Sequence, residues 1–341
     1  MIIAPQPLTG LRGAREKMRK TMNMKRRLLN LTAIIAMLLS AVACQKDILG
    51  GIWWREAKVS FNLQASELHT RAIADASNID VLHWEIYGAD VQNPSSLPLA
   101  EGAVMDSDGD GVFSLDLTLI KDQTYHFIFW AQVDREEGSE HYEVSDLRQV
   151  GIKTYEDELA NDESRAAFFA YEPIHVTGTL NKTITLYRPF AQVNFGTVHY
   201  DVPSLNLTGD LKVNHSEVKV TGIATSFNTL TGMGEGRQDV LFQKNVTPHG
   251  DIDAVEKKLE VKDSRYHWLG MNYFIVSGDE DNVKVDATFH TTHGIVDLSI
   301  DNVPIRENYR TNIIGDLLTT EAVFKVVVDE NFEASDIIVN N

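Results

Sequence analysis

Cysteine is almost absent from this 341-residue chain, whose single thiol belongs to Cys44. One cysteine cannot form a disulfide within the chain, so a folded, exported form has to be held together by its core and its hydrogen bonds. Cys44 directly follows a run of small and apolar residues, a position that argues against an ordinary buried thiol. We therefore expect Cys44 to be modified.

The chain also lacks the short motifs of common catalytic sites. It has no G-x-S-x-G turn, no glycine-rich phosphate loop and no cysteine placed as a nucleophile. Its 11 histidines and many acids could supply a catalytic triad, but no spacing selects one. We expect a protein that is not an enzyme and that needs no cofactor apart from a covalent lipid; a surface hydrolase is the weakest of the hypotheses.

Basic residues are scarce beyond the N-terminal segment. Residues 1–43 hold 8 of the 31 Lys and Arg residues and 1 of the 49 acidic residues, which leaves 23 basic against 48 acidic residues, a net charge of −25. Such a chain repels nucleic acid and anionic lipid, and it stays soluble outside the cell. Nucleic acid is therefore excluded as a partner, but the charge identifies no other.

One apolar run, Leu28–Ala43, follows the basic residues 25–27. It is too short for a comfortable membrane span and is typical of a signal peptide. Its last residues, ending Ala43-Cys44, resemble the lipobox of bacterial lipoproteins, in which the cysteine is acylated. We expect residues 1–43 to be a signal peptide, with residues 1–21 a misassigned start, and residues 44–56 to be a lipidated tether on the outer membrane.

Period-two alternation of apolar and polar residues dominates the rest of the chain. Such alternation is typical of strands with one face on a core and the other in water. It is found in Phe113–Leu119, Thr183–Leu186, Ala191–Phe195, Val283–Phe289 and Val296–Ile300, while Tyr125–Val133 is apolar on both faces, as in a central strand. The sequence predicts an all-β sandwich protein.

One short helix is expected near residues 161–171. Asn161 can cap it, and Ala167, Phe168 and Tyr171 would form its apolar stripe before Pro173. A domain boundary is expected at Arg188-Pro189, because proline interrupts a strand ladder. The expected domains are an N-terminal β-sandwich over residues 57–188 and a C-terminal one over residues 189–341.

Asp106, Asp108 and Asp110 alternate before a glycine, as in the first half of a calcium loop. The second half of the motif fails, because its last ligand position holds Leu117 in a predicted strand. We favour a hairpin turn between Ala103–Met105 and the strand that follows, and keep weak calcium binding as the alternative.

Histidines and tryptophans give no clear site. His290 and His293 lack the glutamate of a zinc protease motif and are expected to be exposed turn residues, so no metal site is predicted from them. The tryptophans could line a sugar-binding surface or pack as core and anchor residues; they are Trp53, Trp54, Trp84, Trp130 and Trp268.

Five segments resemble the fimbrillin-like lipoproteins of Bacteroidales. They are Phe127–Gln132, Asn161–Tyr171, the run Tyr187-Arg-Pro-Phe-Ala-Gln-Val-Asn-Phe-Gly196, Trp268-Leu-Gly-Met-Asn-Tyr273 and Asn302–Ile313, which includes Asn-Tyr-Arg-Thr-Asn. The resemblance implies two tandem transthyretin-like β-sandwich domains that assemble into type V pili. In that family a trypsin-like protease cuts a lipoprotein precursor after an arginine, which removes the first strand and opens a groove for a strand of the next subunit.

The sequence has candidates for each part of that mechanism. The removable strand would be residues 57–63 with Val59, Phe61 and Leu63 on its inner face, and the cut would fall between Arg71 and Ala72, unless Arg71 is an ordinary loop residue. Donor candidates near the C-terminus are Phe324, Val326, Val328, Ile337 and Val339, although 322–328 could instead complete its own sandwich.

The first hypothesis is thus a fimbrial subunit or fimbria-associated lipoprotein of the cell surface that acts in assembly and adhesion. Its partners would be other fimbrial subunits, joined by strand exchange, and a host or bacterial surface receptor. The alternative is an outer-membrane lipoprotein that binds carbohydrate or protein and never polymerises. An exposed aromatic patch would favour the alternative, and a removable first strand over an apolar groove would favour the pilin.

Overall fold

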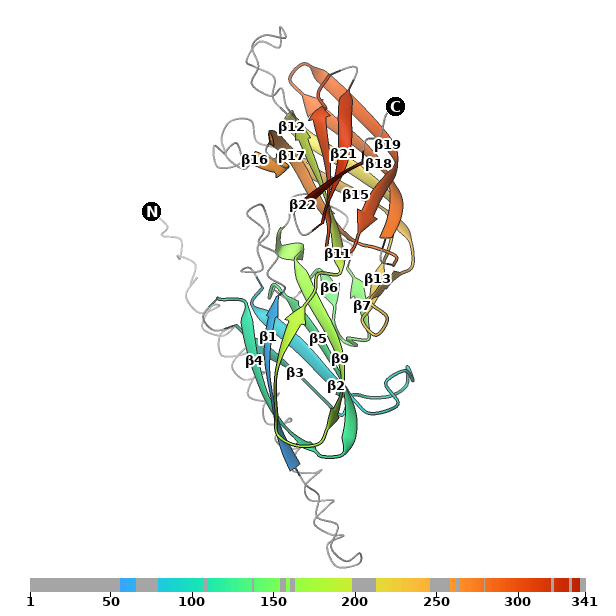
Figure 1. The fold of residues 1–341 in the computed structure, drawn as a ribbon. Helices are drawn as coiled ribbons and strands as arrows, with labels where there is room; N and C mark the ends of the chain where they lie inside the picture. Colours follow the sequence, from blue (N-terminus) through green and yellow to red (C-terminus); the bar gives the residue numbers. More distant parts are fainter. Residues whose placement is uncertain are drawn as a thin grey trace, which may run out of the picture. The chain divides into compact units, whose positions relative to one another are not determined.

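The structure is a computed structural model that describes residues 56–65, 79–106, 109–136, 138–153, 158–159, 163–197, 213–245, 258–261, 264–278, 280–319, 322–330 and 333–337. Strands make up most of these residues, and the one helix among them is the 3-10 helix η2, Glu163–Arg165 (Figure 1). Within the same residues, no helix has the length and apolar character needed to cross a membrane. The predicted all-β sandwich class is confirmed. The predicted signal peptide and residues 44–55 of the predicted tether, Cys44 included, lie outside the described residues.

Two sheets form the first sandwich. A three-stranded sheet has the order β10-β1-β4, with β1 at Glu56–Ala65, β4 at Val112–Ile120 and β10 at Leu180–Leu186. The facing sheet has the order β3-β2-β5-β9, with β2 at Val81–Tyr87, β3 at Ala100–Met105, β5 at Gln123–Gln132 and β9 at Ala167–Val176. Alternate residues of the two sheets share one core cluster that includes Phe61, Leu82, Phe113, Phe127 and Ile184.

Two larger sheets form the second sandwich. One has the order β16-β17-β11-β20-β21-β22, made of Lys258–Val261, Ser264–Ile275, Phe190–Thr197, Arg310–Asp316, Val323–Glu330 and Glu333–Ile337. The other has the order β19-β18-β12-β15-β8, made of Gly294–Arg306, Glu280–Thr291, Val213–Ile223, Gln238–Asn245 and Glu158–Leu159. A second core cluster, which includes Phe195, Phe242, Phe289 and Ile313, fills the space between them.

A small four-stranded sheet and a third core cluster contain residues from both halves of the chain. The sheet has the order β14-β13-β7-β6, with β6 at Tyr142–Glu143, β7 at Gln149–Ile152, β13 at Ser226–Asn228 and β14 at Met233–Glu235. In the cluster, the Trp130 ring lies 6.2 Å from Phe227 and 6.5 Å from Phe190.

The central strand predicted at Tyr125–Val133 is β5. It lies between β2 and β9 and is buried on both faces.

The expected helix over 161–171 is wrong for most of its length. Of the described residues in this segment, 163–171, only those of η2 are helical, and Ala167, Phe168 and Tyr171 lie in strand β9, which pairs with β5 along its whole length. Backbone pairing and burial against β5 outweigh the local helical pattern, since both faces of Ala167–Ala170 are buried. Pro173 is tolerated there because β9 is the last strand of its sheet.

The proposed domain boundary at Arg188-Pro189 falls between β10 and β11. The first core cluster takes all of its buried residues from 57–186, and the second takes its own from 191–326. The third cluster contains residues from both sides, and the buried Arg188 guanidinium lies 4.9 Å from the Phe168 ring and 5.8 Å from the Tyr273 ring. The division into 57–188 and 189–341 stays a prediction.

A buried charged group lies on β2. Glu85 is 4% exposed, and its carboxylate accepts hydrogen bonds from the Tyr87 hydroxyl at 2.8 Å and the Leu147 amide at 3.0 Å. Arg148 stacks 4.6 Å from the Tyr87 ring while binding Asp146 with two hydrogen bonds. Burial raises the pKa of Glu85 to about 7, although both hydrogen bonds act in the opposite direction.

We predict that wild type loses stability as the pH rises from 4.5 to about 7, and that Glu85→Gln does not show this loss. Because the folded pKa lies above the ordinary value of 4.5, the folded state keeps a proton that the unfolded state releases between pH 4.5 and about 7. The free energy of unfolding therefore falls across this window, by at most about 3 kcal/mol. Glutamine keeps an oxygen for both donors and carries no charge to desolvate.

Urea unfolding of the mature chain from pH 4.5 to 8 measures this effect as the difference between wild type and Glu85→Gln. The exposed Glu136→Gln is the matched control and is expected to follow wild type. A Glu85→Gln chain that loses as much stability as wild type over the same pH range would show that Glu85 is not the group responsible.

Candidate functional site

The first strand occupies the middle of its sheet. Along β1, the residues from Val59 to Ala65 pair in parallel with Leu180–Leu186 of β10, and those from Glu56 to Gln64 pair antiparallel with Val112–Ile120 of β4 (Figure 1). Both edges of β1 are therefore hydrogen-bonded. Within this three-stranded sheet, β4 and β10 are joined only through β1.

The inner face of β1 is a row of apolar side chains. Ala57, Val59, Phe61, Leu63 and Ala65 are all at most 7% exposed, as the alternation predicts. The Phe61 ring packs edge-on against two rings of the opposite sheet, Phe127 at 4.9 Å and Phe129 at 5.7 Å. The strand therefore supplies one complete row of the core.

The outer face of β1 makes polar contacts that are open to water. The Ser60 hydroxyl donates to the Asp116 carboxylate, and Asn62 accepts a hydrogen bond of 3.1 Å from Ser114. Exposed pairs of this kind contribute little to stability. The fit of β1 is therefore set by backbone pairing and by its inner apolar row, two features that another strand of the same pattern can reproduce.

The chain leaves β1 at Ala65 and enters β2, in the facing sheet, at Val81. The predicted cleavage residues Arg71 and Ala72 belong to the connection between them and lie outside the described residues. The order of the strands has a direct consequence: a cut in this connection separates β1 from every later strand. After it, only hydrogen bonds and packing would keep β1 in the sheet.

The predicted donor residues lie in two different surroundings. Phe324, Val326 and Val328 belong to β21, which is paired with β20 on one edge and β22 on the other, and the Val326 side chain is fully buried. Ile337 ends β22, the last strand of the sheet, and Val339 lies outside the described residues. In this structure β21 completes its own sandwich.

The aspartates of the calcium-like motif act as turn residues. The Asp106 carboxylate accepts hydrogen bonds from the amides of Gly109 at 2.9 Å and Gly111 at 2.8 Å, and Asp110 accepts one from Val112. Asp108 lies outside the described residues. The expected hairpin is wrong, because β3 and β4 belong to different sheets and the turn carries the chain from one sheet to the other.

Of the two histidines in the His-Thr-Thr-His segment, His293 lies in an exposed turn as expected, whereas His290 does not. His293 lies in the exposed turn between β18 and β19, but His290 lies inside β18, because that strand runs to Thr291. The sequence interpretation missed that His290 lies beside His215 and Glu217 of β12. The spacing of two between His215 and Glu217, which puts both on one face of a strand, is the signal that could have found them.

Of the tryptophans whose side chains are described, neither forms an exposed aromatic surface. Trp130 is fully buried, and Trp84 packs partly buried against the first core cluster, over Gly102 of the neighbouring strand. A Cβ atom at Gly102 would come within 2.7 Å of the Trp84 ring, so this position admits only glycine without rearrangement. These two residues are packing residues.

Comparison with known proteins gives one family and several similar folds. The model of a family described as a family of unknown function (DUF6562) matches residues 55–340. No curated protein sequence matches the chain.

Solved structures that resemble the chain include proteins of Bacteroides, Parabacteroides and Porphyromonas. A Bacteroides thetaiotaomicron protein described as a candidate polysaccharide-binding protein (DUF1812) is 13% identical with a TM-score of 0.50, covering 82% of this chain and 98% of its own. A Parabacteroides distasonis fimbrial assembly protein is 12% identical, with a TM-score of 0.47 and coverage of 84% and 100%. The C-terminally truncated tip fimbrial protein Mfa3 of Porphyromonas gingivalis is 10% identical, with a TM-score of 0.47 and coverage of 80% and 99%. At such identities the first of these shows a shared fold and nothing more.

We predict that Phe61→Ala destabilises the uncut chain by about 3–5 kcal/mol, because it removes a buried ring that packs against both Phe127 and Phe129. The neighbouring Asn62→Ala, on the exposed face of the same strand, is the matched control and should change stability by no more than about 0.5 kcal/mol. Urea unfolding of both variants measures the difference. Equal stabilities would mean that β1 is not packed as described.

Proposed function

The chain belongs to a protein family of unknown function, DUF6562, and we propose that it is a non-enzymatic fimbrial subunit or fimbria-associated surface lipoprotein that assembles by exchange of β1. The observation that carries this proposal is the position of β1. It is central in its sheet and fully apolar on its inner face. The peptide chain links it to the later described strands only through its C-terminal end. The resemblance to fimbrillin-like lipoproteins in five segments supports the same function.

Energetics favour replacement of β1 over its simple loss. Burial of Val59, Phe61 and Leu63 contributes on the order of 5–9 kcal/mol, which is comparable to the whole stability of an ordinary domain. An empty groove would also leave the edges of β4 and β10 without their partner. A cut chain therefore keeps β1 until another strand with the same apolar row displaces it.

The donor would come from the C-terminal segment of another subunit. Release of β22 with Ile337 breaks a single ladder, the one with β21, whereas release of β21 breaks two and opens the second core. The segment that contains Ile337 and Val339 is therefore the better donor. Such a contact joins the tail of one copy to the groove of the next, and it generates a filament rather than a closed ring.

Cys44 would anchor the uncut protein to the outer membrane through its lipid, with the sandwich on the cell surface. Cleavage between Arg71 and Ala72 would release a subunit from that anchor, whereas a protein that keeps its N-terminal segment would serve as the anchor of a fibre. A host or bacterial surface receptor would be the partner in adhesion. The alternative, a lipoprotein that binds carbohydrate without polymerising, gains no support from Trp84 and Trp130, which are packing residues.

Replacement of the cleavage arginine tests processing. In cells, the polymer sheared from wild type is expected to begin at Ala72, whereas Arg71→Ala should remain in the membrane fraction with a lipid-modified Cys44 and give no polymer. Arg237→Ala, which removes an exposed arginine from the second half of the chain, is the control. N-terminal sequencing and intact mass measure the result. Polymer that begins at Cys44, or an Arg71→Ala chain that polymerises as wild type does, would exclude the processed subunit.

Charges in the tail test the donor. The double variant Ile337→Asp and Val339→Asp is expected to be cut normally after Arg71 but to form no polymer, because aspartates cannot enter the apolar groove that β1 leaves. Asn340→Asp, which adds a charge to the same tail, should polymerise. Gel electrophoresis of sheared material without heating measures polymer length. Normal polymers from the double variant would exclude this tail as the donor.

A further inference from the structure

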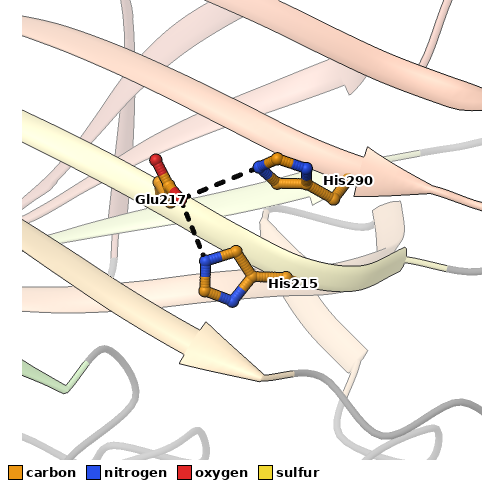
Figure 2. Close-up of side chains that lie close together, drawn as sticks. All are labelled: His215, Glu217 and His290. Carbon is orange, nitrogen blue, oxygen red and sulfur yellow. Dashed lines mark hydrogen bonds and ion pairs between the residues drawn. The ribbon is translucent and has the colours of Figure 1, made fainter.

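Three side chains with metal-binding atoms meet on the outer face of the sheet β19-β18-β12-β15-β8. His215 and Glu217 are two residues apart on β12 and point to the same face, and His290 lies directly opposite His215 in the antiparallel pairing of β12 with β18. Figure 2 shows the two imidazole rings and the carboxylate turned toward a common point. We call this group the His-Glu-His cluster.

The distances within the cluster are short. The Glu217 Oε1 atom lies 3.1 Å from His215 Nε2 and 3.8 Å from His290 Nε2, and one ligand atom of each residue lies within 4.8 Å of the others (Figure 2). The two rings are 5.3 Å apart, centre to centre. A tetrahedral zinc ion with bonds near 2.05 Å separates its ligand atoms by about 3.3 Å. The cluster therefore needs only small side-chain rotations to match this geometry.

Ordinary hydrogen bonding explains only part of the cluster. It accounts for the contact of His215 with Glu217, but 3.8 Å is too long for a hydrogen bond from His290. His290 Nε2 is shielded from solvent and has no hydrogen-bond partner, although a buried polar atom usually has one. A cation held between the three side chains would accept the lone pair of this nitrogen.

Nearby charges leave the cluster available to a cation. Lys219, the next residue along the same face of β12, binds Asp239 at 3.1 Å, and Lys284 of β18 binds Asp286 at 3.3 Å. Thr288, which lies opposite Glu217, donates its hydroxyl to Asp297 of β19. The neighbouring ammonium groups are thus paired with carboxylates of their own, away from the cluster.

We infer that His215, Glu217 and His290 form a zinc site that bridges β12 and β18, with three protein ligands and a fourth position open to water or to a side chain of another protein. Imidazole nitrogens with one carboxylate suit zinc and its neighbours in the transition series, whereas calcium and magnesium prefer sites built of oxygen alone. The site is independent of β1 and of strand exchange.

Zinc titration of the mature chain tests the site. The protein, residues 44–341 without a polyhistidine tag, is freed of metal by chelation and titrated with Zn²⁺ by calorimetry. One equivalent is expected to bind, and the midpoint of thermal unfolding is expected to rise by a few degrees, because zinc binds only where folding brings the two strands together. Calcium should have neither effect.

Variants separate this site from adventitious binding. His290→Ala and the conservative Glu217→Gln should each weaken zinc binding by at least about tenfold, while His293→Ala in the adjacent turn and His175→Ala on β9 should bind as wild type does. Circular dichroism confirms that each variant is folded. Zinc binding that survives both cluster variants, or that His293→Ala and His175→Ala weaken as much, would overturn the assignment.

Discussion

The pairing of β1 with both β4 and β10 is the interaction on which the first sandwich depends. It joins two strands that are otherwise unconnected within their sheet, it places Phe61 against the rings of Phe127 and Phe129, and it buries Val59 and Leu63 in the same core cluster. This position in the sheet has to be filled by a strand, but a strand of another subunit could fill it, since the neighbours of β1 contact its backbone atoms and its apolar row. Strand order, rather than any particular polar group, is thus the physical basis for the proposed assembly.

In the second sandwich, β20 and β21 close the core, and β21 pairs on both edges. The final strand β22 lies at the end of its sheet and can leave at the cost of one ladder. The third core cluster, around Trp130, Phe190 and Phe227, contains residues from both halves of the chain. A strand could therefore be exchanged in the first sandwich while the core of the second sandwich stays intact. A filament whose subunits are joined by strand exchange requires this independence.

Sequence alone predicted what is local. Alternation identified β1, β4, β10, β11 and β18 and the inward side chains of β1, because period-two patterning reports burial directly. The same patterns gave wrong or incomplete predictions for features that depend on pairing between strands far apart in the sequence. Ala167, Phe168 and Tyr171 form a strand because β5 lies beside them, and His290 meets His215 only through the register of β12 with β18. Neither partner can be predicted from the neighbouring sequence. The central position of β1 likewise depends on its pairing with β10, a strand more than 100 residues later in the chain.

The most direct measurement is polymer formation by a chain whose β1 is locked in place. Ser60 and Asp116 face each other in register on β1 and β4, so cysteines at the two positions lie within the span of a disulfide. If β1 has to leave its groove, the oxidised chain with Ser60→Cys and Asp116→Cys is cut after Arg71 yet stays monomeric, and it polymerises once reduced, while Ser60→Cys alone polymerises under both conditions. Equal polymerisation of the oxidised and reduced double variant would contradict the replacement of β1.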